Sequence, residues 1–389
     1  MSAPVPRIGL HSGWDLTDPA AWSGVVAPLA RRITEVHPGV VHLPALTVRD
    51  APIDRARARL GRQSVLPRHA TATARRRSRA LRRELRAAPL DLLVTIAAST
   101  DLVLPPPVPV LQITDATFPA ITGFYPLFSD LSARSRAQGR RVERLAAAHS
   151  THFLVTSDWA RASLISDVGV PGEHITIAPF GPAIPPTPGA EGAPPRSRAA
   201  PPVDGALELL FVTSDWERKN GADALRIHAA VQEHRPSRLT IVGEVPPGTS
   251  GPGIRALGRV DAARLSTLYR KADVLLEPSL ANASGVVITD ALAHGLPVLA
   301  VAAGGVPTLV RPGVNGWLLP PARLVHGATE VLRRVRREEL HDLALTAAED
   351  SRARLSWRAW GEAFERATTA AAAALGPAAA ASVRRPQSR

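Results

Sequence analysis

The stretch from Asp273 to Gly316 constrains the fold more than any other part of the chain. Its apolar runs and glycines indicate a buried strand, a small-residue loop, a helix, a glycine stop and a second buried strand, at residues 274–276, 282–285, 286–294, 295 and 296–301. Elements in this order predict one parallel βαβ unit.

The loop at Ser284 and Gly285 is the part of this unit best placed to bind a ligand. Open α/β sheets bind ligands beyond the carboxyl ends of their strands, where this loop lies. A helix that starts there would offer free N–H groups to a phosphate or to a sugar hydroxyl. An ordinary βαβ element without a ligand is the alternative that the stretch alone leaves open.

The length of 389 residues allows two domains, each with its own core. The chain contains no cysteine, which excludes disulfides and thiolate zinc sites and fits a reducing compartment. Neither a signal-peptide pattern nor an apolar run of membrane-spanning length is present. We therefore expect a soluble, cytoplasmic protein.

Alternating strand and helix patterns predict two successive α/β domains joined by a linker rich in proline, glycine and alanine. Expected strands lie at 7–13, 40–43, 91–96, 108–113, 152–156, 175–178, 207–212 and 239–242, with a short extended piece at 258–260. Expected helices lie at 25–33, 53–88, 129–149, 159–166, 221–233, 262–270, 322–348 and 355–374. The predicted boundaries are 1–183 for the first domain, 184–206 for the linker, 207–350 for the second domain, 351–375 for a C-terminal helix that could pack back on the first domain, and 376–389 for a disordered tail.

Basic residues are concentrated between Arg49 and Arg86, where thirteen arginines stand against three acidic residues. A localised excess of this kind favours an anionic partner surface such as a membrane, although a solvated arginine-rich helix would have the same composition. Aromatic residues do not alternate with the arginines, which makes single-stranded nucleic acid a less favoured partner.

Four charged residues stand where strands or loops would bring them to a binding crevice. Arg218 and Lys219 join a strand end to a helix start, where two cations suit a diphosphate, although they could also be solvated. Asp290 could accept two hydroxyls of a ribose or lie on a helix surface. Asp115 ends a strand and could face a cleft or close a turn.

Metal-binding patterns are missing from the sequence. No two aspartates flank a single residue, and no histidine pair has metal spacing with a supporting carboxylate. We therefore expect no metal and no cofactor. A leaving diphosphate would then be stabilised by lysine, arginine and helix N–H groups.

The second half of the chain resembles the nucleotide-sugar domain of retaining glycosyltransferases with the GT-B fold, the glycogen-synthase-like group (glycosyltransferase family 4, group 1 type). The similar phrases are FVTSDWERKNG, LTIVGE, IRALGRVDAARLSTLYRKADVLLEPS and TDALAHGLPVLAVAAGGVPTLVRPGVNGWLLPP. The first half is similar more loosely, through the loop at 22–24 and the phrases VPVLQITDATFP, LVTSDWARASLISDVGVP and IAPFGPAI. The resemblance implies two Rossmann-like parallel-sheet domains that face a central cleft, and metal-independent transfer of a sugar, such as a hexose, from a nucleoside-diphosphate sugar to an unidentified acceptor.

The resemblance also implies roles for individual residues. Lys219 with Arg218 would hold the donor diphosphate, Gly243 and Val260 would lie near the base, Asp290 would bind the ribose, Ser284 and Gly285 would bind the donor sugar and phosphate, Gly24 would bind phosphate from the facing domain, and Asp115 would orient substrates. The family has glutamates at the positions of Asn282 and Asp290, so the donor-sugar contact expected at Asn282 lacks its charge.

A retaining glycosyltransferase is the function that the sequence favours. One alternative is a GT-B scaffold that binds a nucleotide sugar or a partner without turnover, because Asn282 disables it. Another is a binder of anionic surfaces or nucleic acid through Arg49–Arg86, and an enzyme could also lie against the inner face of the membrane through this segment. A nucleotide-sugar epimerase would need acid and base carboxylates in the cleft, and the sequence offers only Asp115.

Overall fold

The computed structural model describes residues 6–18, 21–60, 64–186 and 205–373. The predicted tail and residues 187–204 of the predicted linker lie outside the described residues. The chain divides into two compact units: unit 1 contains residues 1–178 and 361–389, and unit 2 contains residues 179–360. Among the described residues, no helix combines the length and the apolar character needed to cross a bilayer.

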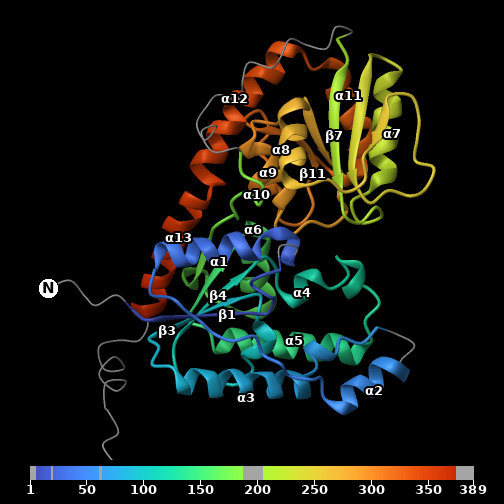
Figure 1. The fold of residues 1–389 in the computed structure, drawn as a ribbon. Helices are drawn as coiled ribbons and strands as arrows, with labels where there is room; N and C mark the ends of the chain where they lie inside the picture. Colours follow the sequence, from blue (N-terminus) through green and yellow to red (C-terminus); the bar gives the residue numbers. More distant parts are fainter. Residues whose placement is uncertain (1–5, 19–20, 61–63, 187–204, 374–389) are drawn as a thin grey trace, which may run out of the picture. The chain divides into compact units, whose positions relative to one another are not determined.

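Unit 1 is built on a six-stranded parallel sheet with the order β2-β1-β3-β4-β5-β6 (Figure 1). Its strands are β1 (Ile8–Ser12), β2 (Val41–His42), β3 (Leu92–Ile96), β4 (Val110–Thr114), β5 (His152–Val155) and β6 (Ile175–Ile177). Its helices are α1 (Val26–Val36), α2 (Pro52–Leu60), α3 (Thr71–Ala87), α4 (Phe118–Ile121), α5 (Ala133–Ala148) and α6 (Asp158–Ser163).

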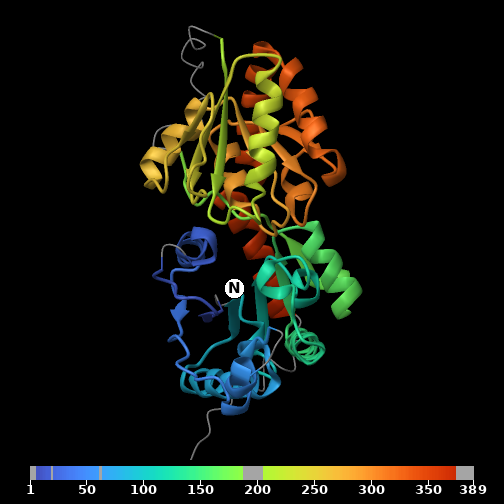
Figure 2. The ribbon, with the colours of Figure 1, turned by 90° about the vertical axis from the view of Figure 1, so that its right-hand side faces the viewer.

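Unit 2 forms the yellow to orange part of Figure 2. It repeats this design with the order β12-β11-β10-β7-β8-β9, again parallel throughout. Its strands are β7 (Leu207–Thr213), β8 (Ser237–Gly243), β9 (Ile254–Ala256), β10 (Val274–Glu277), β11 (Val298–Val301) and β12 (Gly316–Leu319). Its helices are α7 (Gly221–Gln232), α8 (Ala262–Lys271), α9 (Val286–Ala293), α10 (Val306–Leu309), α11 (Leu324–Arg334) and α12 (Arg337–Arg354).

The last helix, α13 (Trp357–Ala373), begins in unit 2 and continues into unit 1 from Gly361. There it packs on α1: the ring of Phe364 meets His37 edge-on at 5.7 Å, and a side chain at Gly361 would collide with the guanidinium of Arg32. The C-terminal helix therefore belongs in part to the core of unit 1.

Strand β10 shows why unit 2 has two apolar layers. Val274 and Leu276 are buried in the core that α7 and α11 cover, whereas Leu275 is buried in the core that α8 and α9 cover. Successive residues of a strand point to opposite faces of the sheet, so a continuous apolar run suits a strand that is covered on both sides. The predicted βαβ unit around β10, α9 and β11 forms in this way.

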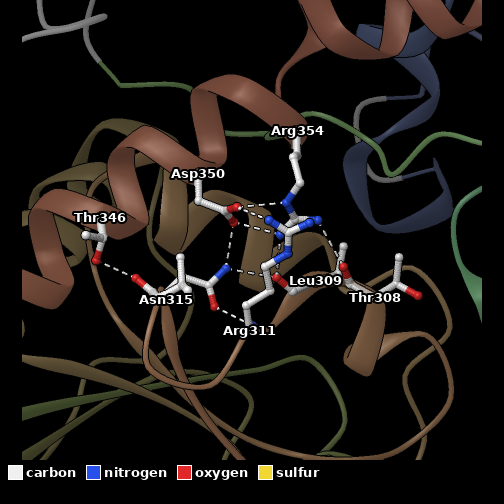
Figure 3. A network of polar contacts seen from close by, with 8 residues as sticks. Thr308, Leu309, Arg311, Asn315, Thr346, Asp350 and Arg354 are labelled. Carbon is white, nitrogen blue, oxygen red and sulfur yellow. Dashed lines mark hydrogen bonds and ion pairs between the residues drawn. The ribbon is translucent and has the colours of Figure 1, made fainter.

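A buried polar network fixes the loop between α10 and β12 to α12 (Figure 3). Asn315 donates to the carbonyl of Leu309 and to Asp350, each at 2.9 Å, and Arg354 and Arg311 also donate to Asp350, at 2.7 Å and 3.1 Å. Burial alone would raise the pKa of Asp350, but the hydrogen bonds and charges of these partners outweigh it and lower the pKa. The network thus fixes the loop in addition to Val310, whose side chain is buried in the core.

The structure corrects several predicted element bounds. The helix predicted at 322–348 is two helices, because the carbonyl of Val335 turns out of the helix to accept a hydrogen bond from Arg235 at 2.9 Å. The basic helix predicted at 53–88 is divided into α2 and α3, with a 3-10 turn that begins at Pro67 between them. The extended piece expected at 258–260 lies earlier, as β9, because Gly258 adopts a φ of +65°.

Candidate functional site

Two neighbouring loops of unit 2 form the candidate site. One follows β7 and leads to α7, the other follows β10 and leads to α9, and both leave the sheet at its carboxyl edge because β7 and β10 pair in parallel. The backbone N–H of Leu280 donates to the carbonyl of Arg218 at 2.9 Å, and the Nη1 of Arg218 donates to the carbonyl of Ala281 at 3.0 Å. The residues predicted from separate parts of the chain are therefore brought together.

Lys219 is held in the turn before α7. Its backbone N–H donates to the carbonyl of Asp215 at 2.9 Å, and the next residue, Asn220, is left-handed with a φ of +58°. The side chain is 6% exposed, and its Nζ lies 3.0 Å and 3.1 Å from the two carboxylate oxygens of Glu277. Arg218 points to Asp215, with 3.5 Å between Nε and Oδ2. Both predicted phosphate ligands therefore have carboxylate neighbours.

Glu277 is the residue of this site that the sequence interpretation missed. It ends β10, is 1% exposed, and accepts hydrogen bonds through Oε1 from Lys219, Ser279 and Asn282. It directly follows the strand predicted at 274–276, and no role was predicted for it from the sequence. The usable signal was a single charged residue directly after Val274–Leu276, because such a position is buried and a buried carboxylate needs partners.

Asn282 bridges Glu277 and the start of α9. Its Nδ2 donates to Glu277 at 3.0 Å, and its Oδ1 accepts the backbone N–H of Gly285 at 2.8 Å. The N–H of Gly285, expected to be free for a ligand, is therefore engaged within the protein. Gly285 has a φ of +62°, and a side chain there would collide with Leu309, so the position requires glycine. Ser284 is half-buried beside it.

Asp290 lies on α9 with its carboxylate turned toward the first residues of the connection between the units. It is 4% exposed, and Oδ1 accepts the backbone N–H of Ile184 at 2.9 Å. Burial raises the pKa of Asp290 to about 7, and the N–H groups of Ile184 and Ala183 oppose this shift. Its expected contact with a ribose stays a prediction.

Gly243 ends β8, the next strand along the sheet, and Val260 lies between β9 and α8. Gly243 ends β8 with a φ of +111°, and a side chain there would collide with the carbonyl oxygen of Thr213 on β7. Its N–H donates to the carbonyl of Gly258 at 2.8 Å. Val260 is partly buried against the α8 side of the core. A role near the base stays a prediction for both residues.

In unit 1, Gly24 and Asp115 are linked through Trp22. The indole N–H of Trp22 donates to Oδ2 of Asp115 at 3.1 Å, just beyond the carboxyl end of β4. Trp22, Ser23 and Gly24 all have positive φ, of 49°, 61° and 83°. Left-handed backbone at non-glycine residues costs about 1–3 kcal/mol each and concentrates at functional sites. The loop at 22–24 therefore has a strained backbone, and a hydrogen bond joins this loop to Asp115.

Comparison with known proteins identifies the architecture. A family model described as glycosyl transferases group 1 matches residues 206–336, which include both loops of the site. The solved structure of sucrose-phosphate synthase from Thermosynechococcus elongatus is similar over 95% of this chain and 100% of its own, with a TM-score of 0.67 and 19% sequence identity. Residues 206–336 therefore form a group 1 glycosyltransferase domain, and the chain has the GT-B fold.

A curated relative and a further solved structure extend the likeness. A D-inositol 3-phosphate glycosyltransferase of Actinosynnema mirum is 36% identical over 155 residues, which are 34% of this chain and 36% of that protein. This chain therefore spans less than half the length of the relatives it matches. The structure of HepE of Anabaena with UDP and glucose covers 94% of this chain and 100% of its own, with a TM-score of 0.60 and 15% identity.

Metal ligands are not grouped in the described part of the chain: no three or more histidine, aspartate or glutamate side chains there are arranged to hold an ion.

The raised pKa of Asp290 leads us to predict how the stability of the protein depends on pH. The pKa of Asp290 is about 7 in the folded protein, whereas the ordinary pKa of an aspartate side chain is 3.8. The folded state therefore binds more protons than the unfolded state between these values, and stability contributed by Asp290 is lost as pH rises from about 4 to 7. We expect the unfolding free energy of the wild type, relative to Asp290→Asn, to fall over this range and to level off above it.

Urea titrations of both proteins across this pH range measure the difference. Asp342→Asn, on the exposed side of α12, is the matched control. A difference between wild type and Asp290→Asn that is independent of pH would contradict the expectation.

Proposed function

We propose that the chain transfers a hexose from a nucleoside-diphosphate sugar to an acceptor, with retention of configuration and without a metal. The observation that carries the proposal is the position of Lys219, at the carboxyl end of β7 and beside the loop that begins α9. The group 1 match covers this region. The fold neighbour HepE, solved with UDP-glucose, supports a nucleotide sugar as the donor.

Lys219 can hold a diphosphate while it stays paired. An ammonium group has three N–H donors, and the oxygens of Glu277 accept two of them. Among the described residues, the third donor has no hydrogen-bond partner. A phosphate oxygen would accept it, and the contact would strengthen as the bond between the sugar and the diphosphate breaks and negative charge grows on the leaving group.

The transfer itself changes two bonds. The acceptor hydroxyl forms a bond to the anomeric carbon on the face that the diphosphate leaves, and its proton passes to an oxygen of the leaving diphosphate. No protein nucleophile is needed for this route. Asp115, which holds Trp22, would orient substrates from unit 1, in line with the resemblance to the retaining enzymes.

A scaffold that binds the donor without turnover is the second candidate. The observation in its favour is that both ends of the Asn282 amide are engaged by Glu277 and Gly285. An amide whose two ends are already engaged has less hydrogen-bonding capacity left for the donor sugar than the free glutamate of the family pattern would have. Binding of a nucleotide sugar without release of the nucleoside diphosphate would favour this candidate.

The donor site makes the first functional prediction. Lys219→Ala should lower kcat/KM for the release of nucleoside diphosphate from the donor, because a contact to the leaving group is lost. The expected loss corresponds to an increase of about 2–4 kcal/mol in activation free energy. The donor is chosen from a panel of nucleotide sugars by thermal shift, starting with UDP-glucose. All assays contain EDTA, in which we expect wild-type activity to persist.

Lys271→Ala, at the exposed end of α8, controls for the loss of a lysine. Full activity of Lys219→Ala would place the diphosphate elsewhere. Activity that requires added Mg²⁺ would contradict the metal-free route.

We also propose that unit 1 lies against an anionic membrane surface. Arginines exposed on α3 are Arg75, Arg76, Arg79, Arg83 and Arg86, and those exposed on the adjacent α5, which the sequence interpretation did not include, are Arg134, Arg136, Arg140, Arg141 and Arg144. Arg77 is not part of this surface, because it donates to Asp101 through Nη2 at 2.9 Å, and Asp101 in turn pairs with buried His11. Two neighbouring helices thus carry the charge.

Replacing Arg75, Arg76, Arg79 and Arg83 with glutamine should weaken binding to vesicles that contain phosphatidylserine. Each basic residue near such a surface contributes about 1 kcal/mol to the binding free energy. Salt screens the attraction between the charges beyond about 8–10 Å. Wild-type binding in sedimentation should therefore also decrease between low and physiological salt.

The matched control replaces four exposed arginines of unit 2, Arg255, Arg264, Arg336 and Arg352. Equal loss of binding in the control would mean that vesicle binding depends on the total positive charge of the protein and not on the arginines of unit 1. If the protein binds nucleic acid tightly and does not bind vesicles, nucleic acid and not a membrane is its anionic partner.

A further inference from the structure

Glu277 and Asn282 form a matched pair of carboxylate and amide beneath the candidate donor site. Glu277 is 1% exposed and accepts from Lys219, Ser279 and Asn282, while the other end of the Asn282 amide accepts from Gly285. A continuous set of hydrogen bonds therefore joins the cation before α7 to the first turn of α9.

The pair explains why position 282 carries no charge here. The Nδ2 of Asn282 lies 3.0 Å from a buried oxygen of Glu277. A glutamate at 282 would place a second carboxylate next to the first, and two carboxylates that share a buried site cannot both stay ionised. An amide avoids this conflict, because it donates at one end to Glu277 and accepts at the other from the N–H of Gly285.

The buried position of Glu277 limits the roles that its carboxylate can have. Its side chain is not exposed, so it acts through its partners and not by touching a ligand. It holds both of its oxygens within hydrogen-bond distance of the Nζ of Lys219 and, through Asn282, fixes the loop that begins α9. Both loops that would contact the donor are set by this one group.

We propose that Glu277 is a positioning residue of the donor site, that it replaces the carboxylate expected at position 282, and that Asn282 is the amide partner that Glu277 requires. The proposal rests on the proposed function for its role in transfer. Its central consequence is that the carboxylate and the amide can be exchanged between the two positions only together.

The test is a set of four proteins: wild type, Glu277→Gln, Asn282→Glu and the double variant that carries both changes. Glu277→Gln leaves Lys219 without its counter-ion, and Asn282→Glu places two carboxylates together. Each single change should lower kcat/KM for cleavage of UDP-glucose by about 10²-fold, because a displaced binding group costs this much. If UDP-glucose is not cleaved, the nucleotide sugar with the largest thermal shift is used.

The double variant returns one carboxylate and one amide to the site, so we expect it to be at least about tenfold more active than either single variant. Non-additivity of this size is expected for residues that are in contact or share one hydrogen-bond network. Glu330→Gln, which breaks a partly exposed ion pair with Arg333 on α11, is the matched control and should leave activity unchanged.

A pH profile separates positioning from a purely structural role. In Asn282→Glu, lowering the pH protonates one of the two carboxylates and restores a donor to the pair, so activity relative to wild type should rise at lower pH. Glu277→Gln should show no such rise. The effect of Glu277→Gln should appear mainly in kcat, because the lost alignment of Lys219 matters most as the diphosphate leaves.

Urea midpoints of the four proteins keep the inference testable whatever the activity. Asn282→Glu should unfold at lower urea than wild type, and the double variant should recover. Additive losses in both activity and midpoint, or full activity of Glu277→Gln, would overturn the inference. Absence of donor cleavage and donor binding in wild type would reject the proposed function alone, because the midpoints would still decide whether the pair is matched.

Discussion

The ion pair between Lys219 and Glu277 is the interaction on which the site depends. It joins the ends of two adjacent parallel strands, β7 and β10, and both side chains are nearly inaccessible to solvent. A buried charge is tolerated only with a partner, and removing one member of such a pair costs about 3–5 kcal/mol. The pair therefore holds two loops in place and keeps a cation at the sheet edge, where the proposed function requires one for the diphosphate.

The surrounding fold makes this pair possible. Strands buried on both faces bring the two loops out at one edge, and glycines remove side chains where the backbone must turn or approach, as at Gly243 and Gly285. In unit 1, the strained turn at Trp22–Gly24 is held by Asp115 at the corresponding edge of the sheet. Each unit thus presents rigid polar groups at the carboxyl ends of its strands, where α/β sheets bind ligands.

The sequence predicted what depends on local pattern and missed what depends on contacts between distant residues. Apolar runs and glycines were enough to predict the βαβ unit of α9. The sequence around Lys219 was enough to place it between a strand end and a helix start, and its contact with a phosphate stays a prediction. Glu277 was missed, because a carboxylate after an apolar strand looks like a stop until Lys219 lies beside it. The break after α11 was missed for the same reason, since it depends on Arg235, far away in the sequence.

Hydrogen exchange followed by mass spectrometry, with and without the nucleotide sugar that binds, tests the account most directly. If the donor lies between the two loops of unit 2, exchange should slow in peptides that cover Ser214–Gly221 and Asn282–Val287, since bound ligand orders the backbone that contacts it. Peptides on the exposed side of α12 should not change. Donor binding that protects other segments and leaves both loops unchanged would contradict the central claim.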